Sequence, residues 1–161
     1  KAYGCRVIVS EMIPKKIEIA RAMGFEVIDC SQSDPAEEVR KLTKEDGADA
    51  VIAAVGVTAA NDQGLEMLKE KDGKLLLFAA GYPAPELHID SNEMHYRRME
   101  LIGTFGADNE DFQEAARALS TGVVDVSKLI EEKTFSLDQI QEAFEAASRP
   151  GMYRVSVLLD Q

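Results

Sequence analysis

The sequence contains no tryptophan, only two cysteines and two histidines, and aromatic residues make up 6% of it. Cys5 and Cys30 do not form a CxxC pair, so we expect reduced, packed thiols and no metal site. The apolar runs are far shorter than the roughly 20 residues that a spanning helix needs. No signal peptide is recognisable, and a cytoplasmic location is therefore expected.

Positive charge is also scarce, with 18 basic against 29 acidic residues and a net charge of −11. An acidic surface repels phosphate backbones and anionic lipid, so we expect neither nucleic acid nor a membrane as a partner. His88 and His95 are expected to be hydrogen-bonded or exposed. No nucleophile with a neighbouring base is recognisable, and no catalytic residue is predicted.

Hydrophobic residues reach 45% of the chain, and short apolar runs alternate with segments of helical periodicity. This alternation predicts right-handed βαβ units and a parallel sheet covered on both faces, which is an α/β fold. The predicted strands are 6–10, 26–29, 49–55, 74–79, 86–90 as an edge strand, 99–105, 129–135 and 153–159. The predicted helices are about 14–23, 35–45, 58–71, 91–97, 109–121 and 136–147.

Capping residues support several of these helix starts. Asp34 precedes Pro35 and is a good N-cap, and Ser136 with Gln139 three residues later forms a capping-box pattern. Thr58, Ser91 and Asn109 are the N-caps expected for three further helices.

Glu11 directly follows the apolar strand 6–10, at the carboxyl end of a parallel sheet, where ligands bind. An acidic residue there accepts hydrogen bonds from the ribose hydroxyls of NAD and repels the 2′-phosphate of NADP. Polar residues also follow strands simply because loops are polar, so position alone leaves both interpretations open. Lys16 could likewise cover an adenine face or be a solvated helix lysine.

Two further strands end in small residues where a bound cofactor would lie. Val55-Gly56 ends one strand, and the segment 78–81 ends the next. Glycine lets a backbone approach a ligand closely, although tight packing and a turn explain the small residues equally well.

The start of the chain suggests a missing part. Residues 1–4 resemble the last turn of a helix with Gly4 as its C-cap. The glycine-rich phosphate loop of a dinucleotide fold should lie about 20 residues before Glu11, which places it and the first strand upstream of Lys1. We therefore expect a fragment in which the strands 6–10 and 26–29 are not joined to the other strands.

Six segments, taken in order, resemble the medium-chain dehydrogenase/reductase superfamily across essentially all 161 residues. They are VIVSE, PKKIEIARAMG, DAVIAAVG, DGKLLLFAAG, HYRRMELIGTFG and FSLDQIQEAFEAA. The resemblance is greatest to the zinc-dependent polyol branch, with the sorbitol, iditol, galactitol-phosphate and threonine dehydrogenases. It implies a Rossmann-like doubly wound parallel sheet lacking its first strand. Residues 1–107 would be a truncated NAD-binding domain and 108–161 a return segment of the catalytic domain.

The resemblance assigns cofactor-binding roles mainly to residues at strand ends. They are Glu11 at the adenosine ribose, Lys16 beside the adenine, Val55 and Gly56 along the cofactor, Phe78, Ala79 and Ala80 at the nicotinamide amide, and Thr104, Phe105 and Gly106 at the nicotinamide end.

The activity implied is hydride transfer between an alcohol or polyol and NAD, with zinc as the Lewis acid. The zinc ligands of the family belong to a half that lies outside this chain, so no metal ligand is predicted here and the chain alone is expected to be inactive. A homodimer or homotetramer with a contact near 86–90 is implied. Ala53 stands where the family often has Glu, and Gly106-Ala107 replaces an Arg-Tyr pair that contacts polyol, which leaves the substrate open.

Two alternatives remain at this point. One is a zinc-free reductase of the same superfamily acting on quinones or enones, although such enzymes commonly use NADPH, which fits poorly with Glu11. The other is a non-catalytic nucleotide-sensing or assembly domain.

Overall fold

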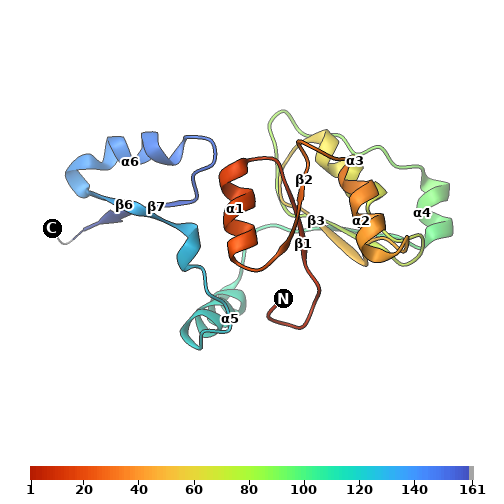
Figure 1. Cartoon of the computed structure of the whole chain (residues 1–161), viewed down its shortest axis with the longest axis horizontal. Helices are drawn as coiled ribbons and strands as arrows, with labels where there is room; N and C mark the ends of the chain where they lie inside the picture. The colour runs from red at the N-terminus through yellow and green to blue at the C-terminus, as the bar shows by residue number, and fades with distance from the viewer. Residues whose placement is uncertain (160–161) are drawn as a thin grey trace. The chain divides into compact units, whose positions relative to one another are not determined.

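The computed structural model describes residues 1–159, which fold as two compact units. Unit 1 combines residues 1–27 with the segment from 107 onward, and unit 2 consists of residues 28–106. Strands and helices alternate along the chain (Figure 1), which confirms the predicted α/β class.

The elements follow the predicted order. The strands are β1 (Ile8–Glu11), β2 (Glu26–Asp29), β3 (Ala50–Ala53), β4 (Lys74–Leu77), β5 (Glu100–Gly103), β6 (Ile130–Ser136) and β7 (Arg154–Leu158). The helices are α1 (Pro14–Ala22), α2 (Pro35–Thr43), α3 (Thr58–Glu66), α4 (Ser91–Arg97), α5 (Asn109–Ser120) and α6 (Ile140–Ala147), with short 3₁₀ turns at η1 (Ser127–Leu129) and η2 (Leu137–Gln139).

The strands pair into separate sheets. β1 pairs with β2, β3–β4–β5 form a parallel three-stranded sheet, and β6 pairs with β7 in parallel. The β1–β2 pair and the β3–β4–β5 sheet are not joined by a strand within residues 1–159, as the sequence predicted. The pairs β3–β4, β4–β5 and β6–β7 all run parallel, which is the pairing that βαβ connections produce.

The core of unit 2 lies on one face of the β3–β4–β5 sheet. Leu75 of β4 is fully buried there against Leu65 and Leu68, which come from α3 and the turn that follows it. On the opposite face Ile52 is 62% exposed, so within unit 2 the sheet is covered on one side only. Double coverage was expected, and unit 2 alone does not provide it.

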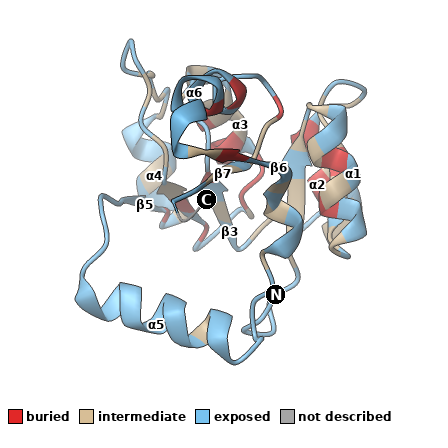
Figure 2. Ribbon diagram, turned by 90° about the vertical axis from the view of Figure 1, so that its left-hand side faces the viewer, coloured by how far each residue is buried: buried red, intermediate tan, exposed pale blue. Residues whose placement is uncertain are grey.

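In unit 1, the segment β6–α6–β7 is a parallel crossover with its own small core. Phe135 of β6 packs with Ala143 and Ala146 of α6, and all three are buried. Helix α5 is almost entirely exposed (Figure 2), although a complete capping box of Asp108 and Asp111 begins it.

Some of the predicted helix N-caps are confirmed, and others are wrong. Asp34 accepts a hydrogen bond from the Glu37 amide at 2.9 Å, and Ser136 with Gln139 forms the expected capping box at η2. The N-caps expected at Thr58, Ser91 and Asn109 are wrong by one position, because Val57, Asp90 and Asp108 precede these helices.

Two element predictions fail for identifiable reasons. The helix predicted over 58–71 ends at Glu66, because the Lys69 amide donates to the Ala48 carbonyl and residues 48 and 68 form a β-bridge. The edge strand predicted over 86–90 does not form. Side chains of α3 bond the backbone of Glu86 and His88 instead.

Candidate functional site

Glu11 is the last residue of β1, as predicted, and its side chain folds back over the turn into α1. Its Oε1 atom accepts hydrogen bonds from the amides of Met12 at 2.8 Å and Ile13 at 3.0 Å. These bonds pair two backbone amides of the turn that connects β1 to α1. Both of these bonds end on Oε1 of the carboxylate.

Lys16 lies on the first turn of α1, and its side chain is half-buried. Its ammonium is 5.5 Å from the centroid of the Tyr153 ring, within the range of a cation–π interaction. Tyr153 precedes β7, and its amide donates to Glu131 at 2.8 Å. The Glu131 carboxylate also pairs with Lys15 at 2.7 Å, and these bonds lower the pKa of Glu131, chiefly through Lys15.

In unit 2, the chain segments that follow β3 and β4 cross in direct backbone contact. A Cβ atom added to Gly56 would collide with the carbonyl group of Ala80, and one added to Gly81 would collide with the carbonyl oxygen of Gly56. Each glycine is therefore required by the backbone of the other segment. This crossing fixes the carboxyl edge of the sheet at two of the predicted cofactor positions.

Exposed apolar side chains surround that edge. Val55, which follows β3, is 53% exposed, and Phe78, which follows β4, is 63% exposed. Phe105, just after β5, is fully exposed, and Gly106 beside it has φ +69°, a value that favours glycine. An apolar edge of this kind is typical of a surface that receives a ligand or another part of a protein.

The structure thus brings the predicted residues together in two groups. Unit 1 holds Glu11 and Lys16, and unit 2 holds the remainder at the ends of its parallel strands. The unit 2 residues are Val55, Gly56, Phe78, Ala79, Ala80, Thr104, Phe105 and Gly106.

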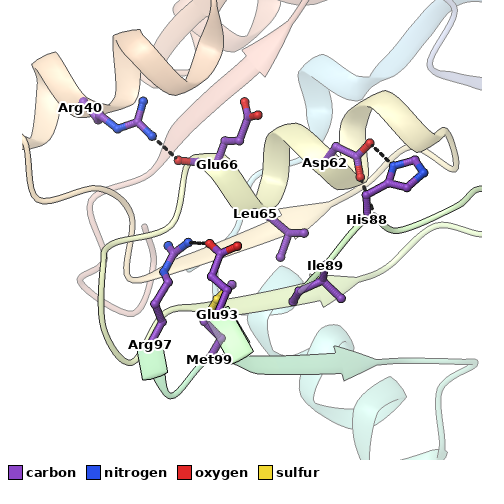
Figure 3. A pocket seen from close by; sticks show the side chains of 9 residues that line it. All are labelled: Arg40, Asp62, Leu65, Glu66, His88, Ile89, Glu93, Arg97 and Met99. Atoms are coloured by element: carbon purple, nitrogen blue, oxygen red, sulfur yellow. Dashed lines mark hydrogen bonds and ion pairs between the residues drawn. The ribbon is translucent and has the colours of Figure 1, made fainter. Parts of the chain in front are cut away.

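A separate pocket in unit 2 contains none of the predicted residues (Figure 3). It has a volume of about 430 Å³, a floor that includes Leu65, Ile89 and Met99, and a charged rim. On that rim the His88 ring contacts Asp62 at 2.8 Å, and it also contacts Glu86 at 3.1 Å. The hydrogen bond and the charge of Asp62, with a further bond to Glu86, raise the pKa of His88.

Sequence reasoning missed Tyr153 and Glu131 as parts of these arrangements. Tyr153 and Glu131 lie more than a hundred residues after the lysines they contact, and no local pattern links such distant positions. Gly81 was included in the segment 78–81 at the end of its strand, but its backbone contact with Gly56 was not predicted.

Residues 1–159 carry neither a grouping of metal-ligating side chains nor a helix suited to crossing a bilayer. No three His, Cys, Asp or Glu side chains in this range are grouped so that they could hold a metal ion. None of the helices in the same range combines the length and apolarity needed to cross a bilayer.

The sequence profile described as zinc-binding dehydrogenase matches residues 1–121. The chain belongs to this zinc-binding dehydrogenase family. The resemblance to the medium-chain superfamily that the ordered segments indicated is therefore confirmed.

Individual members of the family give the same result. A sorbitol dehydrogenase of Bacillus subtilis is 28% identical over 150 residues, which are 91% of this chain and 41% of the relative. An alcohol dehydrogenase of Aeropyrum pernix has a similar fold, with a TM-score of 0.78, 21% identity, and coverage of 94% of this chain and 42% of that one.

A second similar structure, from Sinorhizobium meliloti, is described as a provisional zinc-binding dehydrogenase bound to NADP. It has a TM-score of 0.81, 21% identity, and coverage of 95% of this chain and 45% of that one. The structures confirm the Rossmann-like fold. The chain spans about two fifths of the length of the curated relatives it matches.

Proposed function

We propose that this chain is the cofactor-binding portion of a dehydrogenase that transfers hydride between an alcohol or polyol and NAD. The observation that carries the proposal is the Glu11 carboxylate at the carboxyl end of β1. Membership of the zinc-binding dehydrogenase family supports the oxidoreductase class. The substrate class follows that of the sorbitol and alcohol dehydrogenases to which the chain is similar.

The preference for NAD rests on the electrostatics of Glu11. A carboxylate oxygen accepts hydrogen bonds from both hydroxyls of a ribose diol. The same negative charge repels a 2′-phosphate, which carries close to two negative charges at neutral pH. Because the Met12 and Ile13 amides hold Oε1, the orientation of the carboxylate is set before a ligand arrives, and binding loses less side-chain entropy.

The nicotinamide end is assigned to the carboxyl edge of the unit 2 sheet. The apolar side chains of Val55, Phe78 and Phe105 are exposed there and suit the flat face of a nicotinamide ring. Backbone groups of Phe78, Ala79 and Ala80 would bind the carboxamide, with Thr104 and Gly106 lining the same end. The backbone crossing at Gly56 and Gly81 supports this role, because it fixes the positions of those groups.

The described residues offer a place for a dinucleotide but no group of side chains that could bind zinc. Residues 1–159 contain no set of side chains that could ligate a metal ion. The role proposed for this chain is therefore confined to binding and orienting the cofactor. We further propose that residues 1–107 form the cofactor domain and 108–161 the return segment, and that the chain alone does not turn over an alcohol. An oligomer contact near 86–90 and a cytoplasmic location also stay predictions.

Calorimetric titration of the purified chain with NAD and NADP tests the proposal. Glu11→Ala should weaken NAD binding by about 1.5–3 kcal/mol, the value of hydrogen bonds to a charged group, which is roughly 10- to 150-fold in Kd. The same variant should bind NADP no more weakly than the unaltered chain. Glu18→Ala, which removes an exposed acid on the neighbouring helix α1, is the matched control and should change neither affinity.

Two results would count against the proposal. If Glu11→Ala leaves the preference between the two cofactors unchanged, Glu11 does not select the ribose diol. If the unaltered chain prefers NADP, the cofactor of the Sinorhizobium meliloti structure is the better guide than the charge of Glu11.

A further inference from the structure

Two opposite charges lie close together in the sequence at the proposed adenosine end. Glu11 repels a 2′-phosphate, whereas an ammonium such as that of Lys16 would attract one. A free lysine beside the ribose would therefore offset the selectivity that Glu11 provides. Where the ammonium of Lys16 lies consequently matters for the choice of cofactor.

The structure places this ammonium over the Tyr153 ring, 5.5 Å from its centroid. Lys16 is half-buried, whereas its neighbour Lys15 is exposed and pairs with Glu131. The two adjacent lysines are thus both engaged by residues of the C-terminal segment, one by a ring and one by a carboxylate.

Several contacts hold Tyr153 in this position. Its amide donates to Glu131 at 2.8 Å, and Glu131 is fixed by Lys15 at 2.7 and 2.8 Å through its two oxygens. Gly151, with φ +83°, is buried, and a Cβ added there would lie 3.3 Å from a methyl carbon of Ile13. The loop before β7 is therefore packed against the turn that follows Glu11.

The negative charge of Glu11 also acts on the phenol of Tyr153. Burial raises the pKa of the Tyr153 phenol, and the negative charge of Glu11 raises it further. Tyr153 therefore contacts Lys16 through its ring and is influenced by the charge of Glu11, the two groups that have opposite preferences for a 2′-phosphate.

We propose that Tyr153 is a specificity-determining residue, whose ring holds the Lys16 ammonium so that the Glu11 carboxylate alone faces the ribose 2′ position. This inference rests on the proposed function. Its consequence is that NAD selectivity depends on the C-terminal segment as well as on the residue at the end of β1.

The experiment measures the ratio of Kd for NADP to Kd for NAD by calorimetry with the full chain. In Tyr153→Leu the ratio should fall about 2- to 5-fold, the factor that a cation–π contact at a partly exposed site corresponds to. Tyr153→Phe keeps the ring and should keep the ratio. Adding Lys16→Met to Tyr153→Leu should restore it, because the released ammonium is then gone.

Tyr3→Leu is the matched control, since Tyr3 is an exposed tyrosine of the same unit and bonds only Glu114 among the described residues. An unchanged ratio in Tyr153→Leu would overturn the inference. So would a fall that persists after Lys16→Met is added.

A second variant covers the case in which Tyr153→Leu does not fold. Lys16→Met in the otherwise unaltered chain should leave the ratio as it is, whatever its effect on adenine binding, because the ring already withdraws the ammonium. A rise in the ratio would show that Lys16 acts on the 2′ position despite Tyr153, and would contradict the inference. Failure of the unaltered chain to bind either cofactor would instead overturn the proposed function itself.

Discussion

Gly56 and Gly81 illustrate how single residues set the proposed site. Each is needed because the backbone of the other segment occupies the place of its Cβ atom. Sequence reasoning identified Gly56 as a place of close approach and left open whether a ligand or tight packing requires the glycine. The structure shows another strand end there, a contact that only the pairing of β3 with β4 creates.

Substituting either glycine should therefore destabilise unit 2. Gly81→Ala should lower the free energy of unfolding by about 1–3 kcal/mol, the usual cost of overpacking, as measured by urea denaturation. Gly103→Ala is the control, since a Cβ there meets nothing within 4 Å, and it should change stability by no more than about 1 kcal/mol. Equal losses in the two variants would show that the crossing does not constrain the backbone.

Glu11 shows what a single position in the sequence can and cannot predict. Its place at the end of β1 followed from the apolar run before it and was correct. The two amide bonds that orient its carboxylate were not predicted, because they depend on the turn into α1. The contact of Lys16 with Tyr153 was beyond sequence reasoning, since it joins opposite ends of the chain.

At the scale of elements, helix α3 and the segment 86–88 form one hydrogen-bonded assembly. Thr58 accepts from the Glu86 amide at 3.0 Å, and the buried Asn61 donates to the Glu86 carbonyl at 3.1 Å. The Asp62 carboxylate accepts from the His88 amide and contacts its ring. These bonds explain why the predicted edge strand is absent, because side chains already satisfy part of its backbone.

This assembly should depend on pH through His88. The pKa of His88 is raised by the hydrogen bond and the charge of Asp62, so its contribution to stability is complete at mildly acidic pH and is lost as pH rises through the raised pKa. The pKa of Asp62 is lowered, chiefly by its bond to the His88 ring, so a second loss occurs only at strongly acidic pH. The assembly should be most stable between these two transitions.

Thermal unfolding of His88→Gln between about pH 6 and about pH 9 tests this sign. The unaltered chain should have the higher Tm at the acidic end, and the difference should shrink as pH rises. His95→Gln is the control, because the His95 ring lies edge-on to the Tyr96 ring. This variant should keep the pH dependence of the unaltered chain. A difference that grows with pH would contradict the account.

The ends of α3 show where element prediction fails. The helical pattern after Thr58 continued to Lys71, but the chain leaves the helix after Glu66 to bridge Ala48. Local propensity favours a longer helix there, and a long-range backbone pairing overrides it. Apart from the edge strand over 86–90, which does not form, each predicted strand overlaps an observed one, since the apolar runs are bounded by turns.

At the scale of the whole molecule, the order of strands and helices and the family were both predictable. The alternation of apolar runs predicted βαβ units, and the ordered segments predicted the superfamily that the family profile confirms. The division into two units could not be predicted from the sequence, because unit 1 joins residues 1–27 to the distant C-terminal segment. Contacts such as Lys128 with the Ala22 carbonyl at 2.8 Å connect these distant segments.

The central claim is that the Glu11 carboxylate receives the ribose diol of NAD, and a crystal structure of the chain with NAD tests it most directly. The account predicts the 2′- and 3′-hydroxyls of the adenosine ribose within about 3.2 Å of the Glu11 carboxylate oxygens, with Lys16 still over the Tyr153 ring. A ribose bound elsewhere, with Oε2 of Glu11 facing only water, would contradict it.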